Sequence, residues 1–110
     1  MHCTSIVLNI RRENVQDFER GFREMEMPTH EDLYDRGLLV VSALARVEDI
    51  STERVQGAVQ YLVIAIFKEH EGHTAHDADA RFKAWNEIAD AYQVRDPFVF
   101  GGDSIVTQGP

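Results

Sequence analysis

Three histidines recur at every third position, at His70, His73 and His76, and acidic residues flank them on both sides. Imidazoles together with carboxylates are the donors that zinc and similar divalent ions use in proteins. Acidic residues also favour a helix N-terminus without any metal, and Thr74 and Asp77 have the spacing of a capping box. The spacing is compatible with both interpretations, and we assign no metal to it. We predict instead that His76, with an ordinary pKa of about 6.5, is a catalytic acid–base group.

Hydrophobic periodicity predicts the elements that position these histidines. Alternation predicts a strand over residues 5–11, and apolar residues at three- and four-residue steps predict a helix from Asn14. Pro28 is expected to end that helix before one further turn and a left-handed Gly37. Two apolar strands are then expected at residues 38–47 and 58–68, followed by a second helix at residues 74–92. A last strand is expected from residue 98, with a glycine bulge at residues 101–102.

The order of these elements is β-α-β-β-α-β, the ferredoxin-like arrangement. Right-handed crossovers place both helices on one face of a four-stranded antiparallel sheet, in an α+β fold. The second and third strands are apolar on both faces, and two helices can cover only one of them. We therefore predict a homodimer, in which a second copy covers the other face and the two sheets close into a dimeric α+β barrel.

Composition limits the classes of partner. The 110 residues are expected to form one domain, residues 1–110. A net charge of −8 argues against nucleic acid and against an anionic membrane surface. Cys3 is the single cysteine, so no internal disulfide is possible, and the first residues lack the pattern of a signal peptide. We expect a cytoplasmic protein that binds neither nucleic acid nor membrane.

The segment AHDADARFKAW, residues 75–85, resembles the A-H-x-x-x-x-[HR]-F-[KR]-A-[FW] stretch of antibiotic-biosynthesis-monooxygenase-like domains. The resemblance implies a dimeric α+β barrel and a cofactor-independent monooxygenase that acts on a small aromatic or polyketide-like substrate. It also implies a helix break near residues 77–79, which would turn His76 toward the cavity mouth. Two alternatives stay open: a non-catalytic ligand-binding or stress-associated barrel, and a structural dimerisation module with a packed interior.

The haem-degrading relatives within this resemblance use an asparagine on the first strand and a histidine on the second helix that ligates iron. Asn9 fits the first position, but Asn86 stands at the ligand position and His76 at the position of their tryptophan. An amide does not replace a proximal imidazole. We therefore expect no haem and no other cofactor.

Strand parity suggests which residues face the dimer cavity. The branched aliphatic residues of the first and third strands suit packing beneath the helices, so the opposite parity is expected to face the cavity. Asn9 on the first strand and Tyr61 on the third have that parity, and we expect these two strands to be adjacent and parallel. Asn9, Tyr61 and His76 are therefore the predicted catalytic residues. The predicted substrate-binding residues are Ser42, Arg46, Phe67 and Asn86.

Overall fold

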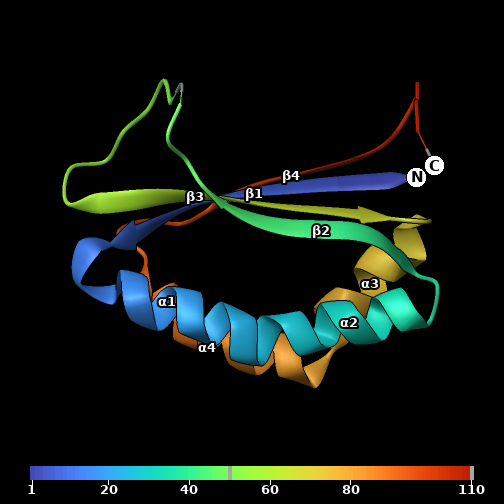
Figure 1. Ribbon diagram of the computed structural model, residues 1–110, viewed down its shortest axis with the longest axis horizontal. Helices are drawn as coiled ribbons and strands as arrows, with labels where there is room; N and C mark the ends of the chain where they lie inside the picture. The colour runs from blue at the N-terminus through green and yellow to red at the C-terminus, as the bar shows by residue number, and fades with distance from the viewer. Residues whose placement is uncertain (50, 110) are drawn as a thin grey trace.

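The computed structural model describes residues 1–49 and 51–109. Within them, a four-stranded sheet carries the helices on one face (Figure 1). The strand order is β2-β3-β1-β4, and each neighbouring pair is antiparallel. The predicted ferredoxin-like α+β fold is therefore confirmed. In chain order the elements are β1 (His2–Arg11), η1 (Arg12–Asn14), α1 (Val15–Gly21), η2 (Phe22–Glu26), α2 (Met27–Asp35), β2 (Leu39–Arg46), β3 (Ala58–Phe67), α3 (His70–Ala78), α4 (Ala80–Tyr92) and β4 (Phe98–Asp103).

The first helical segment continues through Pro28, contrary to the prediction. α1 passes into the π-helical turn η2 and then into α2. Pro28 falls in the first turn of α2, where its missing N–H costs least because the π turn has already interrupted the α-helical hydrogen bonds. α2 ends as predicted at Gly37, whose φ of 75° is left-handed, and Leu38 N–H donates to the Leu33 carbonyl at 2.9 Å.

The second helical segment is divided, as the resemblance implies. α3 begins at His70, earlier than the predicted start, and the backbone becomes extended at Asp79 (φ −69°, ψ 130°). The Asp79 carboxylate accepts from the Arg81 N–H at 2.8 Å and so begins α4. The Arg81 side chain also donates to it, which lowers the pKa of Asp79 to about 2. The break leaves His76 in the last turn of α3, buried against α2 and η2.

The strand register decides which side chains lie under the helices. Direct partners on antiparallel strands point to the same face, and Leu8 pairs with Tyr61 while Asn9 pairs with Gln60. Tyr61 therefore lies on the helix-covered face and Asn9 on the open face. The predictions that these two residues share a face and that their strands run parallel are both wrong. β3 places Tyr61, Val63, Ala65 and Phe67 beneath the helices, and Leu62, Ile64 and Ile66 on the open face.

The core and the last strand complete the arrangement. Phe18, Phe22, Tyr61 and Trp85 form the centre of the main apolar cluster between the sheet and the helices. β4 pairs with β1 in regular register through its two glycines, which rules out the predicted bulge at residues 101–102. Among residues 1–49 and 51–109, no helix is long and apolar enough to cross a membrane.

Candidate active site

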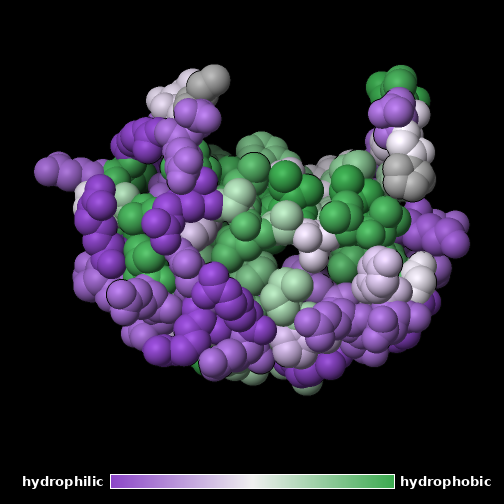
Figure 2. Space-filling model, in the orientation of Figure 1, coloured by the Kyte–Doolittle hydropathy of each residue, from purple (hydrophilic) through white to green (hydrophobic). Residues whose placement is uncertain are grey.

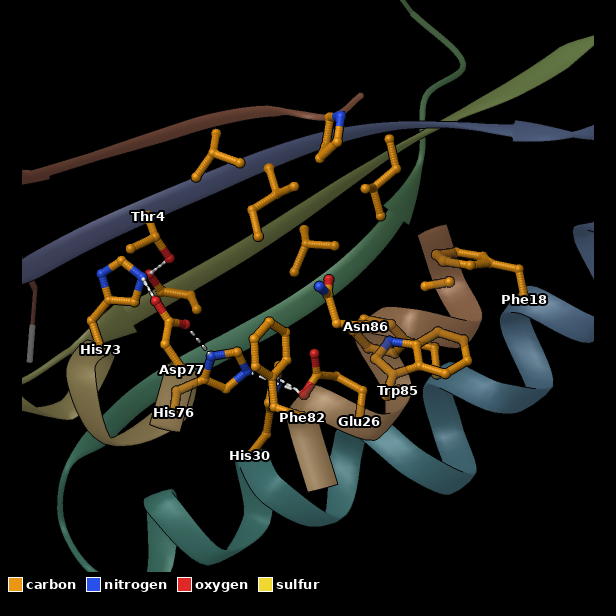
Figure 3. Close-up of a pocket in the computed structure, with 18 of the residues that line it drawn as sticks. Thr4, Phe18, Glu26, His30, His73, His76, Asp77, Phe82, Trp85 and Asn86 are labelled. Carbon is orange, nitrogen blue, oxygen red and sulfur yellow. Dashed lines mark hydrogen bonds and ion pairs between the residues drawn. The ribbon is translucent and has the colours of Figure 1, made fainter. Parts of the chain in front are cut away.

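A pocket of about 310 Å³ lies between the sheet and the helices. This volume is at the lower end of the range for ligand pockets, so it suits a compact ligand. Polar side chains gather where α3 meets η2 and α2, while the rest of the lining is mostly apolar (Figure 3). The apolar walls include Ile6, Leu8, Val63 and Ala65 from the sheet and Phe18, Phe22, Phe82 and Trp85 from the helices.

The close approach of two helices fixes the aromatic wall of the pocket. A side chain at Gly21 on α1 would collide with the indole of Trp85 on α4, so only glycine allows this contact. Trp85 is 3% exposed and packs against Phe18 and Phe22. The wall is therefore rigid before any ligand binds.

His76 stands at the polar end of the pocket with a carboxylate on each ring nitrogen. Its Nε2 lies 3.1 Å from Glu26 Oε1, and its Nδ1 lies 2.9 Å from Asp77 Oδ1 (Figure 3). Glu26 belongs to the π turn η2 and is buried, whereas the Asp77 side chain is 54% exposed. π turns occur often at functional sites. One partner of the imidazole is thus buried, and the other lies at the surface, where its second oxygen is 3.2 Å from His73 Nε2.

The buried carboxylate has a second imidazole partner. His30 Nε2 lies 3.5 Å from Glu26 Oε1, one helical turn away. His30 Nδ1 lies 2.8 Å from Ser42 Oγ on β2. His30 thus contacts Glu26 with one ring nitrogen and Ser42 of β2 with the other, so it links Glu26 to the sheet. These contacts fix the orientation of Glu26 toward His76.

Burial disfavours both charges of the Glu26–His76 pair, but the hydrogen bonds outweigh it. Despite burial, hydrogen bonds from His30 and His76 hold the pKa of Glu26 below its ordinary value. Burial also opposes the imidazolium form of His76, yet the hydrogen bond and charge of Glu26, aided by Asp77, raise its pKa. Near neutral pH, Glu26 is an anion and His76 is a stronger base than a free histidine.

A second histidine cluster lies at the neighbouring end of the sheet. His2 Nε2 is 3.1 Å from His73 Nδ1, and the ring centroids of His2 and His70 are 4.6 Å apart. On their other nitrogens, His2 Nδ1 is 2.9 Å from Asp103 Oδ1 and His73 Nε2 is 3.2 Å from Asp77 Oδ2. Burial lowers the pKa of His73.

Within residues 1–49 and 51–109, potential metal donors come together in two groups, each with three donor atoms within 4.8 Å of one another. Glu26, His30 and His76 form one group, in which each imidazole nitrogen already contacts a carboxylate or a hydroxyl. We assign this group as a hydrogen-bond network. The other group is formed by His2, His70 and His73. Of the three regularly spaced histidines, His70 and His73 therefore lie near His2, and His76 lies in the first group.

Three of the residues predicted to bind or transform a ligand line this pocket: His76, Phe67 and Asn86. The pocket lies on the helix side of the sheet and not in the dimer cavity for which Phe67 was predicted, because the register places Phe67 on the face opposite to the predicted one. Asn86 lies on α4 and is exposed at the pocket opening, and its side chain points toward the sheet (Figure 3). Ser42 does not line this pocket and instead supports His30.

Two other predicted residues, Tyr61 and Arg46, lie away from His76. Both hydrogen-bond to Glu19 on α1, beneath the opposite end of the helix layer. Burial and the hydrogen bond to Glu19 raise the pKa of Tyr61 to about 12, so this phenol is a proton donor and not a base near neutral pH. Neither residue lines the pocket.

Asn9 is 1% exposed and lies on the open face, where its Oδ1 accepts from Gln60 Nε2 at 3.4 Å. The sheet separates it from His76. The prediction that Asn9, Tyr61 and His76 share one cavity is therefore wrong, because the antiparallel register puts Asn9 on the other face.

Glu26 and His30 are site residues that the sequence analysis missed. Their four-residue spacing is the available signal, because residues four apart share a helix face. That signal is lost when Pro28 is taken as the end of the helix, since the two residues then belong to different elements.

Solved structures share this fold over nearly the whole chain. A crystal structure of an antibiotic biosynthesis monooxygenase has a TM-score of 0.71 at 17% identity, covering 96% of this chain and 100% of that chain. SnoaB, a cofactor-independent oxygenase from Streptomyces nogalater, has a TM-score of 0.65 at 17% identity, covering 96% and 95%. A dimeric ferredoxin-like protein of unknown function from Thermobifida fusca has a TM-score of 0.65 at 14% identity, covering 93% of this chain and 90% of that chain.

This chain has the fold of the antibiotic-biosynthesis-monooxygenase-like proteins. The resemblance of residues 75–85 is thereby confirmed at the level of fold. No protein-family model and no curated protein sequence matches the chain. The resembling segment crosses the break between α3 and α4 and brings His76 and Trp85 to the same pocket.

Proposed function

We propose that the protein is a cofactor-independent monooxygenase that oxidises a small planar phenol, quinol or anthrone in the pocket between sheet and helices. The observation that carries this proposal is the buried Glu26–His76 pair at the polar end of an otherwise apolar pocket. An apolar pocket accommodates an aromatic ring system, and a single base is the one group that such chemistry needs from the protein. The shared fold with a cofactor-independent oxygenase supports the proposal.

His76 is the proposed base. Glu26 accepts the proton on Nε2 and so holds the tautomer in which Nδ1 carries the lone pair, as a carboxylate orients a catalytic histidine in hydrolases. In the empty pocket a protonated Nδ1 donates to Asp77, so His76 becomes the base once this proton is lost to solvent. The exposed Asp77 side chain also contacts His73 and leaves His76 when a substrate hydroxyl arrives. Nδ1 then takes the proton of the substrate.

For an anthrone, the reaction balances without a cofactor. His76 removes a proton from the ring CH₂, and the resulting carbanion gives one electron to O₂. The substrate radical and superoxide combine to a peroxide, which is protonated and loses water to leave a ketone. One oxygen atom enters the substrate, and the other leaves as water with both hydrogens of the CH₂. The substrate supplies all the electrons, so no external reductant is consumed.

The test is a panel of quinols and anthrones in air, without added metal or flavin, followed by absorbance and oxygen uptake. We expect at least one compound to be oxidised, and we expect His76→Gln and Glu26→Gln to lower kcat by about tenfold or more. Glu24→Gln is the matched control, because Glu24 lies on the same turn and is exposed. Saturable binding without turnover would favour the ligand-binding alternative, and no binding by any compound would contradict both.

The pH profile gives an independent readout of the base. The groups that face His76 are Glu26 from η2, His30 from α2, and Asp77 and His73 from α3. Because the pKa of His76 is raised, the rate should increase with pH around a midpoint above about 6.5. Removing the negative charge in Glu26→Gln should move this midpoint to lower pH.

We further propose that two copies pair through their open sheet faces. These faces carry exposed or half-exposed apolar side chains, visible as green surface along the sheet in Figure 2. An apolar sheet face of this kind is unfavourable in water, and a second sheet covers it best. The Thermobifida fusca protein that shares the fold is dimeric, which supports the pairing. The residues of the face are Val7, Val41, Ala43, Ala45, Leu62, Ile64, Ile66, Phe98 and Phe100.

A further inference from the structure

We propose that His2, His70 and His73 bind one zinc ion or a similar divalent transition-metal ion at the end of the sheet. The three imidazoles come from the first residues of β1 and the first two turns of α3, which lie next to each other near the N-terminus (Figure 1). One nitrogen from each ring lies within 4.8 Å of the others. Three protein nitrogens with an open fourth position make a common zinc site.

The distance between two of the donors matches that geometry. Zinc–nitrogen bonds of about 2.0–2.1 Å at a tetrahedral angle place two ligand nitrogens about 3.3 Å apart. His2 Nε2 and His73 Nδ1 are 3.1 Å apart, so an ion needs only a small displacement of the rings to be bound by both. The third ring, His70, meets His2 edge-on with the centroids at 4.6 Å.

Carboxylates orient the two closest imidazoles for metal binding. Asp103 on β4 contacts His2 Nδ1, and Asp77 contacts His73 Nε2, so the remaining nitrogens are the ones that face each other. Histidines that bind metals usually have such a partner on the second nitrogen, which fixes the ring and increases its basicity. The two carboxylates also balance the charge of a divalent ion.

The surroundings hold two of the three rings in place before any ion is bound, while His70 is exposed. His2 is 6% exposed, and Phe67 stacks on His73 with the ring centroids 5.5 Å apart and an interplanar angle of 12°. Rigid ligands lose little conformational entropy on binding. The other donor group is different, because Glu26 there already hydrogen-bonds to His76 and contacts His30. An ion bound in that group would have to break those contacts.

A bound ion would connect three elements that are distant in sequence. It would join the start of β1 to α3 directly, and to β4 through Asp103. Because Asp77 also contacts His76, the ion would fix the α3 wall at the polar end of the pocket. Binding of the ion would therefore connect these elements, and the proposed site does not depend on the proposed oxygenation.

The test uses the chain without a histidine tag, because a tag would itself bind zinc. After chelator treatment and dialysis, Zn²⁺ is titrated by calorimetry, and bound metal is counted by elemental analysis. We expect one ion per chain. His73→Gln and His70→Gln should each weaken binding by about 100-fold or more, and Asp103→Asn by about 10- to 100-fold. His30→Gln should bind zinc with the affinity of the unchanged chain.

Circular dichroism checks that each variant is folded. Asp103→Asn keeps the test valid if a histidine variant fails to fold. Co²⁺ serves as a second probe, because its visible spectrum reports nitrogen ligands in tetrahedral geometry. Three results would overturn the proposal: no saturable binding, binding that His73→Gln and Asp103→Asn leave unchanged, or binding that His30→Gln abolishes. The last result would assign the ion to the Glu26 group instead.

Discussion

Replacing Glu26 by Gln keeps the shape of the side chain but removes the charge that His30 and His76 share. The amide oxygen can still accept from His76 Nε2, so the change isolates the electrostatic part of the contact. Hydrogen bonds to charged groups contribute about 1.5–3 kcal/mol, and Glu26 is only 6% exposed, so solvent screens little of this. We expect the free energy of unfolding to fall by about 2 kcal/mol, and Glu24→Gln to change it by less than about 0.5 kcal/mol.

The size of this loss should depend on pH in a defined way. The pKa of Glu26 is lower in the folded state, so its contribution is complete above about pH 4.5 and disappears as pH falls through the folded value. The pKa of His76 is higher in the folded state, so its contribution is complete below about pH 6.5 and disappears as pH rises through the folded value. The difference between Glu26→Gln and the unchanged chain should therefore be largest near pH 5.5.

Urea unfolding at fixed protein concentration measures this difference at pH 3.5, 5.5 and 9. With a slope of about 1–3 kcal/mol per molar urea, a loss of 2 kcal/mol moves the midpoint by about 1 M at pH 5.5. The shift should become smaller at both other pH values. An equal shift at all three pH values would refute the reasoning, because it would show that the Gln side chain is destabilising through its packing and not through the lost charge.

The other predictions concern assembly and haem. Size-exclusion chromatography with light scattering should give about twice the 12.5 kDa chain mass, and Ile64→Asp should give the monomer because an unpaired charge would be buried in the interface. Tyr34→Asp, at a position on α2 that is 62% exposed and lies in the helix layer, should stay dimeric, and a well-folded monomer of the unchanged chain at micromolar concentration would contradict the pairing. Added hemin should give no saturable one-to-one Soret shift, because Asn86 stands at the ligand position; a stoichiometric complex with histidine ligation would contradict this.

The sequence predicts the element order well because each element has its own local signal. The strand at residues 5–11 alternates and Gly37 marks a helix end, whereas the break before Arg81 was implied only by the family resemblance. Which face of β3 lies under the helices is a different question, because β3 is apolar on both faces. Only the register with β1 decides it, and register depends on contacts between residues about fifty positions apart. A preference for branched aliphatic residues gave the correct face for β1 and the wrong face for β3.

The site was predicted only in part for the same reason. The segment at residues 75–86 correctly indicates His76 and Asn86, whereas Phe67 lines the pocket although its parity was expected to face the dimer cavity. Glu26 was missed because a local rule ended the helix at Pro28, whereas the π turn before it lets the chain continue. His2 was missed because nothing near it in sequence indicates that β1 and α3 meet.

Asp77 is the residue at which the two proposed sites meet. Its Oδ1 contacts His76 at 2.9 Å and its Oδ2 contacts His73 at 3.2 Å, so one carboxylate orients both imidazoles. Asp77→Asn should therefore change two independent measurements: zinc affinity should weaken by about 10- to 100-fold, and the pH midpoint of oxidation should move to lower pH, because Asp77 helps to raise the pKa of His76. Glu24→Gln should change neither. If Asp77→Asn alters zinc affinity but leaves oxidation unchanged, then Glu26 alone orients His76 and the two sites act independently. If it alters oxidation but not zinc affinity, the ion does not use His73 in the orientation that this carboxylate fixes.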